Sequence, residues 1–565
     1  MGARPVASLV CALAILAGLV VAQPAAAAET GFVEAIGQTV NGPDKAADLG
    51  VGWVRLFLGW NDIEPTPGAF NDGSLAAFAG QVASYRARGI KVLVVLTSSP
   101  QWASGSAGII GAPQNPADFA AFAAHSVAMV PGVAAWEIWN EADDNLFWEN
   151  GPNAPAYAAL LKATYPAIKA QNPNAIVVST GMVANDGDFL TELYDNGAQG
   201  SFDAVGVHTD TACLIAPPGF YYRELDGRVG RFAFTGYREV HYVMTQHGDG
   251  AKPIWMTELG WNTGSTAANS CKDGSQAGTK PEGVTPADQA KNLTDAYRCL
   301  AADPFVPVTM WFSLQDRPGS TQDNAHLGLI RTDGVAKPAY AALKALRNGT
   351  NVTPDPSCGG LVDHDAPALQ VQRPSNGLRF ADLLSLKAAA ADTPGGAGIS
   401  TIELLADGAR VVKTKGGSFS LDPWFRAGER LGLGPHTLTF RARDNAGNVT
   451  DQSVAVERVL PGQLTPIATR LALRARPRIG RRVRLQGRLS FAPTELPVGG
   501  RVYLSLERRT GGRYRRVKQV SVTARAPFAI TVKLPGLGRY RALARYKGGA
   551  PFRPSRSPYR AFGAR

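Results

Sequence analysis

The sequence predicts an α/β fold, a (β/α)8 barrel, followed by two all-β sandwich modules. Between residues 31 and 350, eight short and nearly continuous apolar runs alternate with longer amphipathic segments. Strands that are buried on both faces and separated by helices produce this pattern. After residue 365, apolar and polar residues alternate between turn signals such as Asp-Gly, which is typical of antiparallel strands. The chain has 565 residues, and single cores stop growing at roughly 250–300 residues.

The segment boundaries follow from these changes of pattern. We expect a signal peptide over residues 1–28, the barrel over 29–350, a linker over 351–365, and sandwich modules over 366–460 and 461–565. A positively charged start, an apolar run and an Ala-rich tract are typical of an export signal. A membrane anchor is the alternative, but the run is short for a span. We therefore expect a secreted protein, extracellular or associated with the cell envelope, without a membrane span after signal removal.

Four cysteines remain beyond the predicted signal, and an even number in an exported chain favours disulfides. The barrel layout favours the pairs Cys213–Cys271 and Cys299–Cys358, with buried free thiols as the alternative. The sequence contains no Cys-x-x-Cys pair, so a zinc site is not expected.

The eight apolar runs have the lengths of buried strands. Helix-start signals lie between them, as in Asn115-Pro116 and Thr285-Pro286, where a capping side chain precedes a proline. A doubly wound sheet is the alternative fold, but the first run lacks the glycine-rich phosphate turn that such a fold requires. The runs are 32–37, 53–58, 91–96, 134–139, 175–179, 204–208, 254–258 and 308–312.

Two of these runs lead into glutamates that the barrel should bring together. The fourth run leads into Asn140-Glu141, and the seventh ends at Glu258, 117 positions later. Strand C-termini form the active face of a barrel, and its fourth and seventh strands lie nearly opposite each other. One carboxylic acid can then protonate a departing glycosidic oxygen while the other carboxylate attacks the anomeric carbon. A separation of about 5–5.5 Å gives retention of configuration.

The motifs around these glutamates resemble those of clan A glycoside hydrolases. Asn140-Glu141 and the segment Thr257-Glu258-Leu259-Gly260-Trp261 are most similar to family 5 and family 39 enzymes, over residues 31–345. The resemblance implies Glu141 as the catalytic acid/base and Glu258 as the nucleophile. The reaction that it implies needs no metal and no organic cofactor.

The same resemblance implies roles in substrate binding for five further residues. In the segment WVRLFLGWNDIEPTPGAF, Arg55 is expected beneath the nucleophile, which it orients. Asn140 is expected to bind the sugar 2-hydroxyl, and His208 to lie near the sugar. Trp102 belongs to the third-strand loop, and Trp311 is expected as the aromatic floor of the first subsite. We interpret Glu137 as a structural partner of a buried arginine, with Arg55 as the candidate.

The sequence departs from the family pattern at one position. Family members usually carry a Tyr two residues after the histidine, hydrogen-bonded to the nucleophile, whereas this chain has Asp210. Tyr221 or Tyr222 is a candidate substitute. This departure is the one feature that favours the alternative function, a noncatalytic carbohydrate-binding or cell-surface adhesion protein on a degenerate barrel.

Charge is distributed unevenly along the chain. Residues 461–565 contain 25 Lys and Arg but only two Glu, so the net charge of this segment is +23. The net charge of the whole chain is +12, so the rest of the chain has a net charge of −11. Within the segment 366–460, LADGARVV followed by GPHTLTFRARDNAGNVT resembles bacterial immunoglobulin-like modules. We expect an anionic envelope polymer as a partner of the basic module. Nucleic acid is not expected, because the chain is predicted to be exported and its arginines alternate along strands as on a solvent face.

These observations predict a secreted retaining glycoside hydrolase, most simply a monomer, whose partner is a carbohydrate substrate. It would cleave O-glycosidic bonds of a β-linked polysaccharide or oligosaccharide by double displacement. The sequence leaves open the sugar, internal or terminal cleavage, and hydrolysis or transglycosylation.

Overall fold

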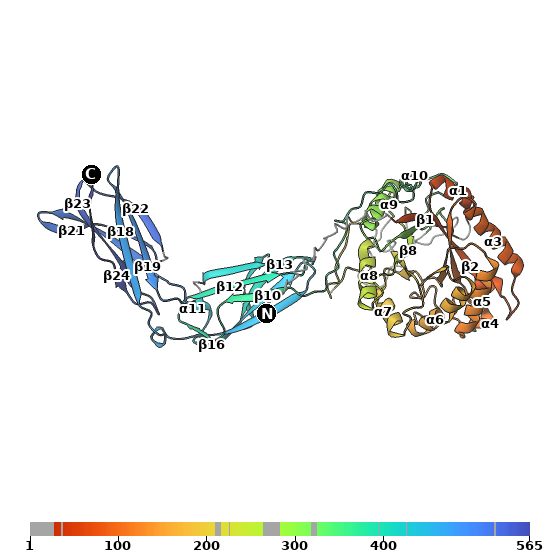
Figure 1. Ribbon diagram of the computed structural model, residues 1–565, viewed down its shortest axis with the longest axis horizontal. Helices are drawn as coiled ribbons and strands as arrows, with labels where there is room; N and C mark the ends of the chain where they lie inside the picture. The colour runs from red at the N-terminus through yellow and green to blue at the C-terminus, as the bar shows by residue number, and fades with distance from the viewer. Residues whose placement is uncertain are drawn as a thin grey trace, which may run out of the picture. The chain divides into compact units, whose positions relative to one another are not determined.

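The computed structural model describes residues 28–35, 38–209, 216–224, 226–263, 283–317, 325–394, 396–424, 427–524 and 527–564. The chain divides into two compact units, Met1–Val362 and Asp363–Arg565 (Figure 1). Most of the predicted signal segment lies outside the described residues, as do Asp210, Cys213 and Cys271. In the described part of the chain, no helix combines the length and the apolar character needed to cross a bilayer.

The first unit is built on nine parallel strands in the spatial order β5-β4-β3-β2-β1-β9-β8-β7-β6. A further parallel bridge joins Val178, the last residue of β5, to Ala204 before β7, so the sheet closes on itself. Each of the eight predicted runs overlaps one strand, and β6 is an additional two-residue strand, which confirms the (β/α)8 fold. The first strand, Glu29–Val33, begins and ends earlier than its predicted run, which covered 32–37. The strands are β1 (Glu29–Val33), β2 (Trp53–Gly59), β3 (Lys91–Thr97), β4 (Ala135–Ile138), β5 (Ile176–Val178), β6 (Met182–Val183), β7 (Val205–Thr209), β8 (Ile254–Leu259) and β9 (Val308–Trp311).

Helices surround this sheet on its outer side (Figure 1). Two of them begin where the sequence predicts. Asn115 caps α5 through Ala117 N, and Thr285 caps α9 through Asp288 N, each followed by a proline. The helices are α1 (Gly42–Leu49), α2 (Trp60–Ile63), α3 (Asp72–Arg86), α4 (Gln101–Ser104), α5 (Pro116–Met129), α6 (Ala154–Gln171), α7 (Gly187–Asp195), α8 (Tyr237–Gln246), α9 (Pro286–Leu300) and α10 (Pro338–Ala345), with a 3-10 turn, η1, at Phe234–Gly236.

Strand alternation divides the side chains of the barrel between two cores. Val54 and Leu56 of β2 belong to the large core between strands and helices, whereas Trp53 belongs to a smaller cluster that includes Trp255. The rings of Trp53 and Trp255 meet edge to face, with centroids 4.8 Å apart. Arg55 shares the side of β2 that carries Trp53, because alternate residues of a strand face the same way. A buried arginine is thereby placed inside the barrel.

A disulfide joins Cys299 of α9 to Cys358, across 59 positions of the chain. This bond confirms one of the two expected pairs. It ties the segment after the last barrel helix to α9. The other expected pair lies outside the described residues.

The second unit contains four sheets in two groups, each group with its own hydrophobic core. The first group has the orders β10-β12-β15 and β11-β17-β16-β13-β14, and the second has β18-β19-β22 and β21-β20-β23-β24, with β25 on β23. The predicted all-β character is confirmed, while the boundary at residue 460 and the immunoglobulin-like type stay predictions. The strands are β10 (Ala368–Arg373), β11 (Leu378–Phe380), β12 (Leu384–Ala391), β13 (Ile399–Ala406), β14 (Ala409–Lys415), β15 (Ser418–Trp424), β16 (Gly434–Asp444), β17 (Val449–Arg458), β18 (Thr469–Arg478), β19 (Arg482–Phe491), β20 (Arg501–Thr510), β21 (Arg513–Thr523), β22 (Phe528–Lys533), β23 (Gly538–Tyr546), β24 (Ser555–Arg556) and β25 (Arg560–Ala564), with the short helices α11 (Ala427–Arg430) and η3 (Pro461–Gln463).

Candidate active site

The chain turns sharply where β4 ends. Trp139 and Glu141 both have left-handed backbones, with φ of 69° and 47°. Residues other than glycine rarely adopt this conformation, and such positions concentrate at functional sites. The indole nitrogen of Trp139 donates to Phe147 O at 2.9 Å, which holds the turn in place. The turn carries Asn140 and Glu141 to the carboxyl end of the strand.

A β-bulge lies opposite, where β7 pairs with β8. Val207 pairs with Met256, but His208 pairs with Glu258, so Thr257 is an extra residue in β8. Bulges redirect side chains and are common next to active sites. The extra residue places Glu258 directly across from His208.

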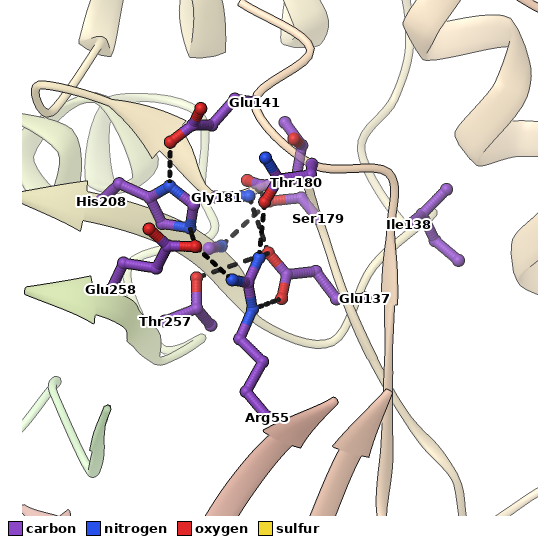
Figure 2. A network of polar contacts seen from close by, with 12 residues as sticks. Arg55, Glu137, Ile138, Glu141, Ser179, Thr180, Gly181, His208, Thr257 and Glu258 are labelled. Atoms are coloured by element: carbon purple, nitrogen blue, oxygen red, sulfur yellow. Dashed lines mark hydrogen bonds and ion pairs between the residues drawn. The ribbon is translucent and has the colours of Figure 1, made fainter. Parts of the chain in front are cut away.

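His208 lies between the two glutamates (Figure 2). Its Nδ1 atom is 2.6 Å from Glu141 Oε1, and its Nε2 atom is 3.9 Å from Glu258 Oε1. One carboxylate oxygen from each glutamate and one nitrogen of His208 all lie within 4.8 Å of one another. Each glutamate side chain is 17% exposed, so both carboxylates reach the surface of a largely desolvated site.

Arg55 connects this pair to the barrel interior. Its fully buried guanidinium donates to Glu258 through Nη1, to Glu137 Oε2 through Nε at 2.7 Å, and to Asn140 Oδ1 through Nη2 at 2.8 Å. The expected pairing of Glu137 with Arg55 is therefore observed. Arginine suits this position because its planar guanidinium has five N–H donors and can bond three side chains at once. The ammonium group of a lysine does not have this planar arrangement of donors.

Glu137 is the anchor of the network. Its Oε1 accepts from Arg55 Nη2 at 3.0 Å, from the backbone N–H of Gly181 at 2.9 Å and from Thr257 Oγ1 at 3.4 Å. A buried carboxylate requires such compensation, because leaving it unpaired costs several kcal/mol, roughly 3–5 when one partner is removed. The interactions of Glu137 therefore fix Arg55, which in turn fixes Glu258.

Opposing influences act on the charge of Glu258. Burial raises the pKa of Glu258 above its ordinary value, while the positive charges of His208 and Arg55 lower it and the carboxylates of Glu141 and Glu137 raise it. The net direction is upward. Arg55 and His208 thus limit a rise that burial alone would make larger.

Asp143 was not predicted from the sequence as a site residue. Its side chain is buried, and Oδ2 accepts from Val183 N at 2.8 Å. Burial, followed by the charges of Asp186 and Glu141, raises the pKa of Asp143 well above its ordinary value. Its position two residues after Glu141 was visible in the sequence, but its burial was not.

Gly181 is the second residue that sequence reasoning missed. A Cβ atom at this position would lie 2.0 Å from His208 Nε2 and 2.3 Å from His208 Cδ2. Only a glycine permits this close approach of the imidazole to the backbone. Gly181 also donates its N–H to Glu137, so it supports both the histidine and the anchor.

The aromatic residues expected to bind sugar occupy different environments. Trp102 is half-buried, and its Nε1 donates to Glu64 O at 2.9 Å. Trp311 has no exposed surface, and its Nε1 donates to Leu327 O at 2.9 Å. Tyr221 is 42% exposed, while the Tyr222 hydroxyl accepts from Phe232 N at 3.4 Å. Sugar contacts at Trp102 and Trp311, and the replacement of the family Tyr, stay predictions.

The donor set of Glu141, His208 and Glu258 has the composition of a divalent-cation site. Arg55 already supplies a positive charge to Glu258, and Nδ1 of His208 is engaged with Glu141. These interactions are more typical of two carboxylates that act on a substrate than of residues that coordinate a metal ion.

Comparisons with known proteins give matches among solved structures. No family model and no curated protein matches the sequence. Among solved structures, a family 39 glycoside hydrolase from Bacteroides cellulosilyticus WH2 is 19% identical, with a TM-score of 0.44 over 71% of this chain and 80% of that chain. The endo-beta-1,4-mannanase of Thermotoga petrophila is 13% identical, with a TM-score of 0.38 over 77% and 98%. A glucosidase from Croceicoccus marinus is 13% identical, with a TM-score of 0.41 over 90% and 94%. These structural neighbours are glycoside hydrolases. At such low identities and scores, any activity has to be inferred from the site itself.

Proposed function

We propose that the protein is a retaining glycoside hydrolase of the clan A type that cleaves β-linked glycans by double displacement. One observation carries this proposal: an oxygen of Glu141 and an oxygen of Glu258 lie within 4.8 Å of each other at the carboxyl ends of β4 and β8. Carboxyl groups about 5–5.5 Å apart suit attack by one carboxylate, because no room remains for a water molecule between them and the sugar.

The environments of the two glutamates suggest their roles. Glu258 is paired with the permanent cation of Arg55, which supports its ionised, nucleophilic form. Glu141 contacts His208, whose ring nitrogens can donate or accept a proton (Figure 2). Glu258 therefore attacks the anomeric carbon while Glu141 protonates the leaving oxygen. Water activated by Glu141 then hydrolyses the glycosyl-enzyme.

Export of the protein is part of the proposal. The Cys299–Cys358 disulfide supports it, because disulfides persist in oxidising compartments. The substrate would then be an extracellular or envelope-associated polysaccharide or oligosaccharide.

The alternative is a noncatalytic carbohydrate-binding or adhesion protein. It is favoured by Asp210, which stands where the resembling families carry a Tyr that supports the nucleophile. The pairing of Arg55 with Glu258 argues against it, because a binding site has no need for a cation that holds a carboxylate ready to attack.

The test is a screen of the purified protein against aryl β-glycosides and β-linked polysaccharides, with Glu258→Gln as the comparison. The account predicts release of aglycone or reducing sugar from at least one substrate by the parent protein, and almost none by the variant. Binding of glycans without turnover by the parent protein would favour the adhesion alternative. Turnover that survives in Glu258→Gln would refute the assignment of the nucleophile.

A further inference from the structure

The sheet β18-β19-β22 of the second unit presents an outer face with an unusual charge pattern. Eight exposed cations project from it, and the other outward side chains are Ala472, Gln486, Ser490, Ala529 and Thr531, so this face carries no carboxylate. We call this surface the basic face. Its cations are Arg470, Arg474, Arg476, Arg478, Arg482, Arg484, Arg488 and Lys533.

Several of these cations lie directly opposite one another. In the strand register, Arg476 pairs with Arg484, and Arg482 pairs with both Arg478 and Lys533. Like charges in directly opposite positions destabilise a sheet. Between described residues, none of the eight cations has a carboxylate within ion-pair distance. The opposed cations of the basic face therefore repel one another, with no described carboxylate near enough to offset the repulsion.

Two other sheets of the same unit contain arginines that are paired with acids. On β16 and β17, Arg441 lies directly opposite Asp451, and the two form an ion pair of 2.7 Å. On the sheet that contains β20 and β23, Arg541 pairs with Glu507 at 2.6 Å. The sheet that contains β20 and β21 also has opposed arginines, such as Arg508 across from Arg515. The basic face differs from it in having no carboxylate among its outward side chains.

The basic face also holds a depression of about 1030 Å³. At its end, Ile479 in the turn between β18 and β19 is 97% exposed. Three of the eight cations, Arg478, Arg482 and Arg484, line this depression, near the turn that joins β18 to β19. It is lined by Pro477, Arg478, Ile479, Arg482, Arg484, Thr531 and Gly563.

We propose that the basic face binds a linear acidic polysaccharide that carries carboxylates on its sugar units. Neighbouring strands lie about 4.7–4.9 Å apart and alternate residues of a strand about 6.6–6.8 Å apart, so the cations form a lattice with spacings of roughly one sugar unit. Guanidinium groups match carboxylates in a two-pronged geometry. The bound polymer would remove the repulsion between the opposed cations.

Two other polyanions fit this surface less well. Proteins that hold single-stranded nucleic acid interleave cations with aromatic rings for base stacking, and the outward residues of the basic face include no aromatic. Proteins that lie on membranes present an apolar face, whereas Ile479 is the single large apolar side chain among the residues that line the depression. The Cys299–Cys358 disulfide favours an oxidising compartment, in which polysaccharides are accessible.

The experiment compares two triple variants of the full chain with equal losses of charge. The first is Arg476→Gln/Arg478→Gln/Arg484→Gln on the basic face. The second is Arg513→Gln/Arg515→Gln/Arg516→Gln, whose arginines are exposed on β21. All proteins carry Glu258→Gln, so that turnover by the barrel cannot consume the probe. Binding to polygalacturonate is measured by calorimetry at about 0.15 M salt and at higher ionic strength.

The parent chain is expected to bind polygalacturonate with an affinity that falls as salt rises. The basic-face variant should weaken binding roughly tenfold or more and flatten the salt dependence, because fewer counterions are released. The β21 variant should bind nearly as well as the parent. The proposal would be overturned if both variants lost the same affinity for polygalacturonate, or if the folded parent did not bind it. It would also be overturned if the parent bound duplex DNA or anionic vesicles as tightly as polygalacturonate. None of these outcomes depends on what the barrel hydrolyses.

Discussion

The Nδ1 atom of His208 lies 2.6 Å from Oε1 of Glu141, while the opposite edge of the same ring faces Glu258 at 3.9 Å. The imidazole therefore contacts the acid/base candidate and influences the nucleophile candidate at the same time. Four elements position it: the bulge at Thr257, the left-handed turn at Glu141, the strand β7 and the glycine at position 181.

Gly181→Ala should displace His208, because the added methyl carbon would lie 2.0 Å from its Nε2 atom. The contact with Glu141 would be lost, and we expect kcat to fall on the order of 10²-fold, the lower end of the range for acid–base catalysis. Gly80→Ala is the control, since Gly80 lies in helix α3 with no atom near a new Cβ. Unchanged kcat in a folded Gly181→Ala protein would show that the position of His208 is irrelevant to turnover.

His208→Gln should change the pH dependence of kcat/KM. Burial raises the pKa of Glu258, and His208 lowers it, so removal of the imidazole should raise this pKa further. Activity requires ionised Glu258 and is lost as pH falls through its pKa. In the parent protein, the midpoint of the acid limb should lie above the ordinary glutamate pKa of about 4.3. In His208→Gln this midpoint should therefore move to still higher pH. His125→Gln, at a half-buried position paired with Asp72, should leave the limb in place. A limb unmoved by His208→Gln would contradict the coupling.

Arg55→Met should destabilise the barrel, because it leaves Glu137 buried without its cation. We expect a loss of about 3–5 kcal/mol in the free energy of unfolding. Tryptophan fluorescence in urea reports on the barrel, since nine of the ten tryptophans lie before residue 362. The double variant Arg55→Met/Glu137→Gln should recover part of the loss. If the double variant were less stable than the single one, the explanation by an unpaired charge would be wrong.

Asp143→Asn should alter how stability depends on pH. The pKa of Asp143 is raised in the folded state, so its protonated form is favoured there and the group stabilises the fold at low pH. This contribution is lost as pH rises from about 3.9, the unfolded value, through the folded pKa. The variant should therefore lose less stability than the parent between acidic and neutral pH, as followed by urea midpoints. Asp333→Asn, at a half-exposed position, should behave like the parent.

Much of the barrel could be predicted from the sequence, because strands buried on both faces are continuously apolar and their order fixes which ends meet. The pairing of Arg55 with Glu137 was predictable for the same reason: a buried charge needs a partner. Thr257 could not be identified as a bulge, since a one-residue shift of register leaves no trace in composition. The approach of His208 to Gly181 depends on the packing of two neighbouring strands. The complete burial of Trp311 likewise depends on tertiary contacts, among them its hydrogen bond to Leu327 O and its stacking with Trp261.

The stereochemistry of the first product tests the central claim most directly. Once a β-glycoside substrate is found, proton NMR during the first minutes of reaction shows which anomer is released before mutarotation. The two glutamate oxygens within 4.8 Å of each other predict the β-anomer, that is, retention through a glycosyl-enzyme. Initial release of the α-anomer would mean direct attack by water, and Glu258 would not be the nucleophile.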